Sequence, residues 1–281
     1  MDLRLRPELP APAATKKNAA GRNFQRPLYP DLAAVLAPGQ PTQTGRIFGD
    51  ASPQHRITAR AGAAVTHVVF DMDDVLAVRD TAATCASLAL AAGLAPDEVM
   101  ERLYLPEHTS FDEGADAGKD MATGDEFVRQ LNDQLRGGRA VTREDWVAAR
   151  RAGMDPAPLA GTVALARAVR DGGRATLVLL TNNNPLLAEE LPAIFPEVAQ
   201  LFAPHAWCSS MFGTAKPDPM VFERLALTLG VPPASLYFVD DNASNIAAAK
   251  QAGLRGAFHF TGPNDVPALW AALVDAGALP T

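Results

Sequence analysis

Asp71 and Asp73 stand two residues apart, directly after the apolar run Val68–Phe70. In open α/β sheets, reactive side chains lie just beyond the carboxyl ends of the strands. A carboxylate in that place can attack phosphorus and form an acyl phosphate, which divides one difficult reaction into two easier ones. We therefore predict that Asp71 is the nucleophile. We also predict that Asp73 protonates the leaving oxygen and afterwards activates water.

The ends of three later predicted strands supply further polar groups, namely Thr181, Lys216 and the pair Asp240-Asp241. Lys216 would keep Asp71 ionised and neutralise the approaching phosphoryl group. Thr181 and the Asn182 amide are placed to hold the oxygens of the phosphoryl group that is transferred. Mg²⁺ prefers a few carboxylates together with water and phosphate oxygens, so Asp71 and the later acidic pair predict a magnesium site.

The elements that must position these groups follow from the pattern after residue 64. Short apolar runs, typical of strands buried on both faces, alternate with helical patterns, which predicts an α/β fold with a Rossmann-like parallel sheet. The predicted strands are Val65–Phe70, Ala175–Thr181, Ala206–Ser209, Leu236–Val239 and Gly256–Phe260. The predicted crossover helices are Thr162–Arg170, Pro219–Leu229 and Ala243–Ala252.

About 100 residues separate the first two predicted strands, too many for one crossover. Four amphipathic stretches lie in this gap: Ala82–Ala92, Pro96–Tyr104, Gly124–Leu135 and Arg143–Ala152. A helical insertion that emerges beside Asp71 should act as a lid over the site. The charged side chains of this insertion that could contact a substrate are Arg102, His108, Lys119 and Arg129.

Composition excludes several other classes of protein. With 281 residues, 48% of them hydrophobic, the chain can form a sizeable core. Its net charge of −7 and its few aromatic residues argue against a nucleic-acid partner. No apolar run is long enough to cross a membrane. Cys85 and Cys208 are too few for a disulfide framework, which favours buried thiols in a reducing compartment and predicts a cytoplasmic protein. The oligomeric state stays open.

Residues 1–63 differ from the rest of the chain. They contain eight prolines and nine Lys and Arg against four Asp and Glu, with no sustained periodicity except a possible short helix at Leu28–Leu36. Such a composition predicts a disordered extension. The predicted organisation is therefore an extension (1–63), a core (64–77 and 157–281) and a helical cap (78–156).

Four motifs carry a resemblance to a known family: Phe70–Val75, Leu179–Asn184, Gly213–Pro219 and Phe238–Ile246. They resemble, in order and spacing, the motifs of the haloacid dehalogenase (HAD) superfamily, in which Mg²⁺-dependent phosphatases predominate. The resemblance spans roughly residues 65–262. It implies an aspartyl-phosphate mechanism, with Asp241 and the Asp73 carbonyl as metal ligands and Asp240 in support. The third and fourth motifs are most similar to those of small sugar-phosphate phosphatases, so the implied substrate is a sugar phosphate or a similar phosphorylated metabolite.

Two positions depart from the family pattern. Asp74 stands where relatives often have Gly, which places an extra carboxylate near the metal or the cap hinge. Asn245 stands where many relatives have a second acid, and we expect it to form hydrogen bonds at the start of a helix.

Three alternatives to the phosphatase remain. A phosphomutase shares every motif and differs only in how its cap shields the aspartyl phosphate from water. A haloacid dehalogenase uses the same nucleophile but does not need Asp73 or the Asp240-Asp241 pair. A non-catalytic phosphate-binding relic would be expected to have lost a motif residue, and this chain has all of them.

Overall fold

The computed structural model describes residues 65–104, 111 and 122–281. The predicted extension, the short helix at 28–36, His108 and Lys119 lie outside these residues. Where the chain is described, no helix is both long and apolar enough to cross a bilayer.

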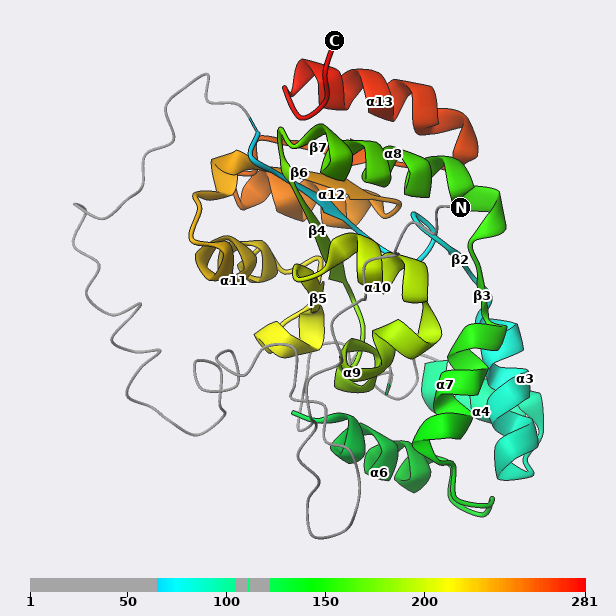
Figure 1. Cartoon of the computed structure of the whole chain (residues 1–281). Helices are drawn as coiled ribbons and strands as arrows, with labels where there is room; N and C mark the ends of the chain where they lie inside the picture. Colours follow the sequence, from blue (N-terminus) through cyan, green and yellow to red (C-terminus); the bar gives the residue numbers. More distant parts are fainter. Residues whose placement is uncertain (1–64, 105–110, 112–121) are drawn as a thin grey trace, which may run out of the picture.

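A five-stranded parallel sheet forms the centre of the protein (Figure 1). Its strand order is β5-β4-β1-β6-β7, so β1 lies in the middle between β4 and β6. The strands are β1 (His67–Phe70), β4 (Thr176–Thr181), β5 (Ala206–Cys208), β6 (Leu236–Asp240) and β7 (Gly256–His259). All five predicted strands are confirmed, with ends that differ by one or two residues, and the α/β class is confirmed with them.

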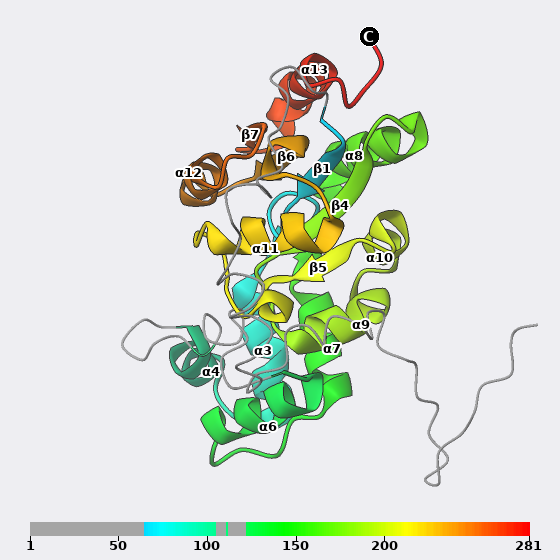
Figure 2. The same cartoon turned by 90° about the vertical axis from the view of Figure 1, so that its left-hand side faces the viewer.

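Both faces of the sheet are buried, as the continuous apolar runs predict. In β1, Val68 and Phe70 point into one hydrophobic cluster, whereas Val69 points into the other. The first cluster includes side chains of α8 (Ala160–Gly172), α9 (Pro185–Ile194), α10 (Pro196–Phe202) and α13 (Val266–Asp275). The second cluster lies against α11 (Met220–Leu229) and α12 (Ala243–Gln251) on the opposite face (Figure 2).

The register of the strands places the predicted site residues at one edge. Phe70 of β1 lies opposite Leu179 of β4 and Val239 of β6. The next residue, Asp71, donates its backbone N–H to the carbonyl of Val239 at 2.9 Å. Asp71 and Asp240 therefore leave the sheet at the same level, side by side.

Of the helices described between β1 and β4, four lie together beyond this edge of the sheet (Figure 1). They are α3 (Thr81–Ala92), α4 (Pro96–Tyr104), α6 (Gly124–Gln134) and α7 (Arg143–Ala152), as predicted. Capping boxes at Thr123 and Thr142 begin α6 and α7, because each threonine side chain and an acid three residues later satisfy free backbone N–H groups. The boundaries of a cap domain at 78 and 156 stay a prediction.

Two short strands, not predicted from the sequence, connect the insertion to the core. They are β2 (Val78–Arg79) and β3 (Met154–Asp155), which pair in antiparallel fashion. The chain thus enters and leaves the insertion at one place, and we call this strand pair the hinge.

Ion pairs join the inserted helices to α9 of the core. The Arg143 guanidinium of α7 lies 2.8 Å from Glu190 and also contacts Glu189, and it lies 2.9 Å from Asp125 of α6. The backbone N–H of Gly124 donates to Glu189 at 2.7 Å. These contacts place the insertion over the carboxyl edge of the sheet.

Candidate active site

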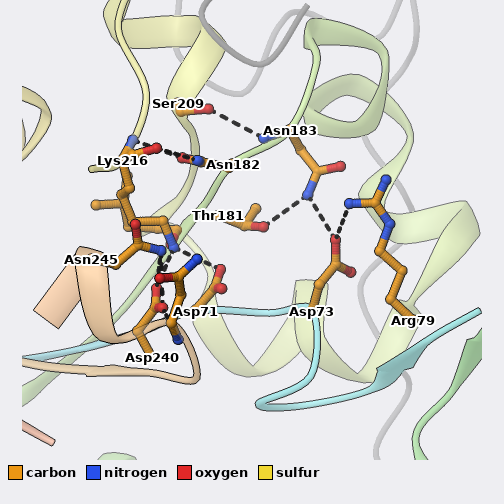
Figure 3. A network of polar contacts seen from close by, with 12 residues as sticks. Asp71, Asp73, Arg79, Thr181, Asn182, Asn183, Ser209, Lys216, Asp240 and Asn245 are labelled. Atoms are coloured by element: carbon orange, nitrogen blue, oxygen red, sulfur yellow. Dashed lines mark hydrogen bonds and ion pairs between the residues drawn. The ribbon is translucent and has the colours of Figure 1, made fainter. Parts of the chain in front are cut away.

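A buried lysine between two carboxylates forms the centre of the site (Figure 3). The Nζ of Lys216 lies 2.9 Å from Oδ1 of Asp71 and 2.7 Å from Oδ2 of Asp240. The Lys216 side chain is 1% exposed, and those of Asp71 and Asp240 are 10% and 0% exposed. The structure therefore brings together three predicted site residues from the first, third and fourth motifs.

Lys216 is held by groups at the end of β4. The side-chain amide of Asn182 donates to the Lys216 carbonyl at 2.7 Å, and the Lys216 N–H donates to Asn182 Oδ1 at 2.9 Å. The Nζ of Lys216 also donates to the carbonyl of Leu180 at 3.2 Å. The Asn182 side chain thus positions Lys216, a use that the sequence analysis did not predict.

Asp240 is held by the start of α12. Its Oδ1 accepts the Asn242 N–H at 2.8 Å, and its two oxygens accept from Nδ2 of Asn245 at 2.9 and 3.1 Å. Asn245 lies in the first turn of the helix, as expected, but its side chain bonds to the carboxylate of Asp240. The N-cap of α12 is Asn242, whose Oδ1 accepts from Ser244.

The charges at this edge do not balance within the described part of the chain. One oxygen from each of Asp71, Asp240 and Asp241 lies within 4.8 Å of the others, and Lys216 is the cation between the first two. Burial, reinforced by the charge of Asp240, raises the pKa of Asp71 to about 8, although Lys216 opposes the shift. Burial and then Asp240 also raise the pKa of Asp241. Oxygen ligands and excess negative charge suit a hard divalent cation such as Mg²⁺.

Asp73 lies apart from this cluster, next to Arg150 and Arg79. Its oxygens lie 3.1 and 3.3 Å from Nη2 of Arg150 and 3.7 Å from Nη1 of Arg79. Burial alone would raise the pKa of Asp73, but the charges of Arg150 and Arg79 outweigh it and lower the pKa. The structure therefore favours the carboxylate form of Asp73.

Asn183 connects Asp73 with Thr181. Its Nδ2 donates to Thr181 Oγ1 at 2.8 Å and to Asp73 Oδ2 at 3.4 Å (Figure 3). Thr181 is 1% exposed, at the last position of β4. Asn183 was not predicted from the sequence, although a run of three asparagines directly after the Thr181 strand was the available signal.

Asp74 adopts the left-handed backbone region, with φ 58°. Glycine adopts this region without steric cost, and Asp is one of the few other residues that tolerate it. The Asp74 side chain accepts the backbone N–H of Arg79 at 3.0 Å. This contact places the extra carboxylate at the hinge, and its charge also helps to raise the pKa of Asp241, so it lies near the acidic cluster as well.

Two of the charged insertion residues lie in local contacts. Arg102 pairs with Glu98 and donates to the carbonyls of Gln134 and Arg136. Arg129 lies 3.8 Å from Asp133, and its side chain is 64% exposed. Both arginine side chains therefore contact other residues of the insertion.

Comparison with known proteins agrees with this fold. A Rossmann-like sheet with a carboxylate–lysine cluster at its carboxyl edge defines an α/β enzyme with a candidate phosphoryl-transfer site. The family model described as haloacid dehalogenase-like hydrolase matches residues 65–253. The chain belongs to this family of hydrolases.

Individual proteins are similar to the chain in sequence or in fold. The chain is 30% identical over 202 residues to Phosphatase MT3486 of Mycobacterium tuberculosis, and the match covers 68% of this chain and 85% of that protein. Its fold is similar to that of a predicted HAD-like family hydrolase from Porphyromonas gingivalis, with a TM-score of 0.59, 21% identity and coverage of 75% and 98% of the two chains. It is also similar to a HAD family enzyme from Bacteroides thetaiotaomicron in complex with magnesium and inorganic phosphate, with a TM-score of 0.56, 17% identity and coverage of 73% and 98%.

Proposed function

We propose that this hydrolase is a Mg²⁺-dependent phosphatase that cleaves a small phosphate monoester through an aspartyl phosphate. The observation that carries the proposal is the buried Lys216 between Asp71 and Asp240. A lysine in this position stabilises the attacking carboxylate of Asp71 and the phosphoryl group that is transferred to that carboxylate. The name of the mycobacterial relative and the magnesium and phosphate in the Bacteroides enzyme support the proposal.

In the first half-reaction, an oxygen of Asp71 attacks phosphorus and the bond from phosphorus to the substrate alcohol breaks. Asp73 gives a proton to the departing oxygen in this step, because the negative charge of the bound phosphate raises the pKa of Asp73, which the arginines lower in the free site. Lys216, the hydroxyl of Thr181 and the backbone amide of Asn182 hold the phosphoryl oxygens.

In the second half-reaction, water attacks the phosphorus of the aspartyl phosphate. Arg150 and Arg79 favour the carboxylate form of Asp73, and this carboxylate takes the proton of that water. The bond from phosphorus to Asp71 breaks, and inorganic phosphate leaves. Asp71, Asp240, Asp241 and the Asp73 carbonyl would hold Mg²⁺, which supplies positive charge against the phosphoryl oxygens.

The inserted helices form the cap of this proposed enzyme. They lie over the edge that carries Asp71 and are joined to α9 by Arg143. A cap of this kind admits small phosphorylated metabolites, sugar phosphates among them, more readily than a folded protein.

The test is release of inorganic phosphate from an aryl phosphate, with Mg²⁺ and with EDTA. We expect activity that requires Mg²⁺ and falls on the order of 10³-fold or more in Asp71→Asn. Asp97→Asn, the same change at an exposed position of α4, is the matched control. Equal activity of wild type and Asp71→Asn would contradict the mechanism.

The alternatives are distinguished by the substrates that they convert and by the products that they release. A phosphomutase would convert one sugar phosphate isomer into another with little free phosphate. A dehalogenase would release halide from a 2-haloacid and would keep its activity in Asp73→Asn. A relic site would be inert with aryl phosphate and with a panel of phosphorylated metabolites.

A further inference from the structure

A small pocket lies between the inserted helices and the core, next to Asp73. Most of its lining residues are hydrophobic, among them Leu103, Tyr104, Phe127, Leu131 and Trp146. Among the described lining residues, Arg79 and Arg150 are the charged ones. The free volume of the pocket is about 10 Å³, close to the space of one water molecule.

Arg150 is an unusual residue for such a wall. It is 3% exposed and lies on the buried side of α7 with Trp146 and Ala149. Its Nη2 pairs with Asp73, but its Nε and Nη1 are buried and have no hydrogen-bond partner among the described residues. Buried charged donors without partners are costly, so these two donors of the guanidinium indicate a ligand.

The chemistry of the missing partner follows from geometry and charge. A guanidinium presents its donors as a planar fork that matches the two oxygens of a carboxylate or a phosphate. Arg79 and Arg150 bring two positive charges to the pocket wall, and Asp73 balances one of them. The remaining single charge matches one carboxylate better than a phosphate dianion. A carboxylate is the smaller group, and since the free volume holds about one water molecule, its binding requires the inserted helices to move away from the core.

We propose that Arg150 binds a carboxylate on the alcohol part of the substrate, so the substrate class is the phosphate esters of short hydroxy acids. This inference rests on the proposed function, in which Asp73 serves the oxygen that leaves phosphorus. Because Nη1 is bonded to the same carbon as Nη2, which contacts Asp73, a carboxylate that accepts from Nη1 lies a short chain away from that oxygen. Arg150 is then a specificity-determining residue, supplied by the insertion.

The test compares two substrates of nearly equal size. Phosphoglycolate carries the carboxylate, and its carboxamide, phosphoglycolamide, replaces the charge with a neutral group. We expect wild type to prefer phosphoglycolate in kcat/KM by roughly 10- to 100-fold, the effect of one charge-assisted hydrogen-bonded pair. Arg150→Gln should reduce that preference to about 3-fold or less, and Arg150→Lys, which keeps the charge but loses the fork, should lie between them.

The ratio of the two substrates separates binding of the carboxylate from a purely structural role. If Arg150 only positions Asp73, both substrates lose activity equally in Arg150→Gln and the ratio does not change. Arg151→Gln, at the exposed neighbouring position on α7, is the matched control and should keep the wild-type ratio. Circular dichroism confirms that each variant is folded.

Two outcomes would overturn the inference. Wild type could hydrolyse both compounds with equal kcat/KM, or Arg150→Gln and Arg150→Lys could retain the full preference. In either case hydrolysis of the aryl phosphate would persist, so the proposed phosphatase would stand without this specificity. A protein inert to every phosphate ester would contradict the proposed function itself, and the inference with it.

Discussion

Replacement of Lys216 by Met should destabilise the protein strongly, because it removes the cation between two buried carboxylates. At separations of 2.7 and 2.9 Å, each ion pair has a Coulomb energy of roughly 6 kcal/mol at an effective dielectric constant near 20. The substitution also removes the free-energy cost of burying a charged lysine, and this offsets much of the lost Coulomb energy. We expect a net loss of about 3–5 kcal/mol in the free energy of unfolding, the usual effect of breaking a buried pair.

The assay is urea denaturation in EDTA at pH 9, where Asp71, with its pKa of about 8, is ionised, followed by far-UV circular dichroism. Lys250→Met, at an exposed position of α12, is the matched control and should change stability by less than about 0.5 kcal/mol. The double variant Lys216→Met/Asp240→Asn should recover part of the loss, because it removes one of the two unpaired carboxylates. A loss below about 1 kcal/mol for Lys216→Met would refute the argument that Lys216 neutralises a buried acidic pair.

Three further predictions concern the charge of the site, the contact of the insertion with the core, and the hinge. In EDTA, stability should fall as pH rises from about 4 to about 8, by up to about 1.4 kcal/mol per pH unit, because the pKa of Asp71 is higher in the folded protein than its ordinary value of 3.8. Urea midpoints at pH 5 and 9 should show a smaller fall for Asp71→Asn. Arg143→Met should cost about 1 kcal/mol at low salt and less in 1 M NaCl, measured in the same way, because salt screens the ion pairs to α9. Gly153→Ala should lower the melting temperature and cost about 1–3 kcal/mol, since its new Cβ would lie 2.5 Å from the Asp80 carbonyl. Gly172→Ala, whose Cβ has room, is the control for that change.

Much of the sheet could be predicted because its strands are continuous apolar runs that end in polar residues. The helices α9 and α10 were not predicted, since prolines at 185, 192 and 196 interrupt the pattern, although two of them stand at favourable first-turn positions. The helix α13, which packs through Leu269 and Leu273, was also missed. The strands β2 and β3 have two residues each, too few to show any periodicity.

The candidate site could be predicted where a motif contains the residue, and not where packing brings it in. Asp71, Lys216 and Asp240 follow from their motifs, and the structure places them in contact. Arg150 belongs to no motif, and it meets Asp73, 77 positions earlier, only because α7 folds back over the sheet. Its one sequence signal is its place four residues after Trp146, on the apolar side of a helix.

The hinge has a consequence for how this protein can change over time. Because Val78–Arg79 and Met154–Asp155 pair with each other, the insertion begins and ends at one point in space. A segment with adjacent ends can be lengthened, shortened or exchanged without displacing the strands that carry the carboxylates. Arg150 belongs to the exchangeable segment, whereas Asp71, Lys216 and Asp240 belong to the fixed one. Selectivity for the alcohol can therefore evolve, or be engineered, as a separate module while the bond-breaking groups stay unchanged.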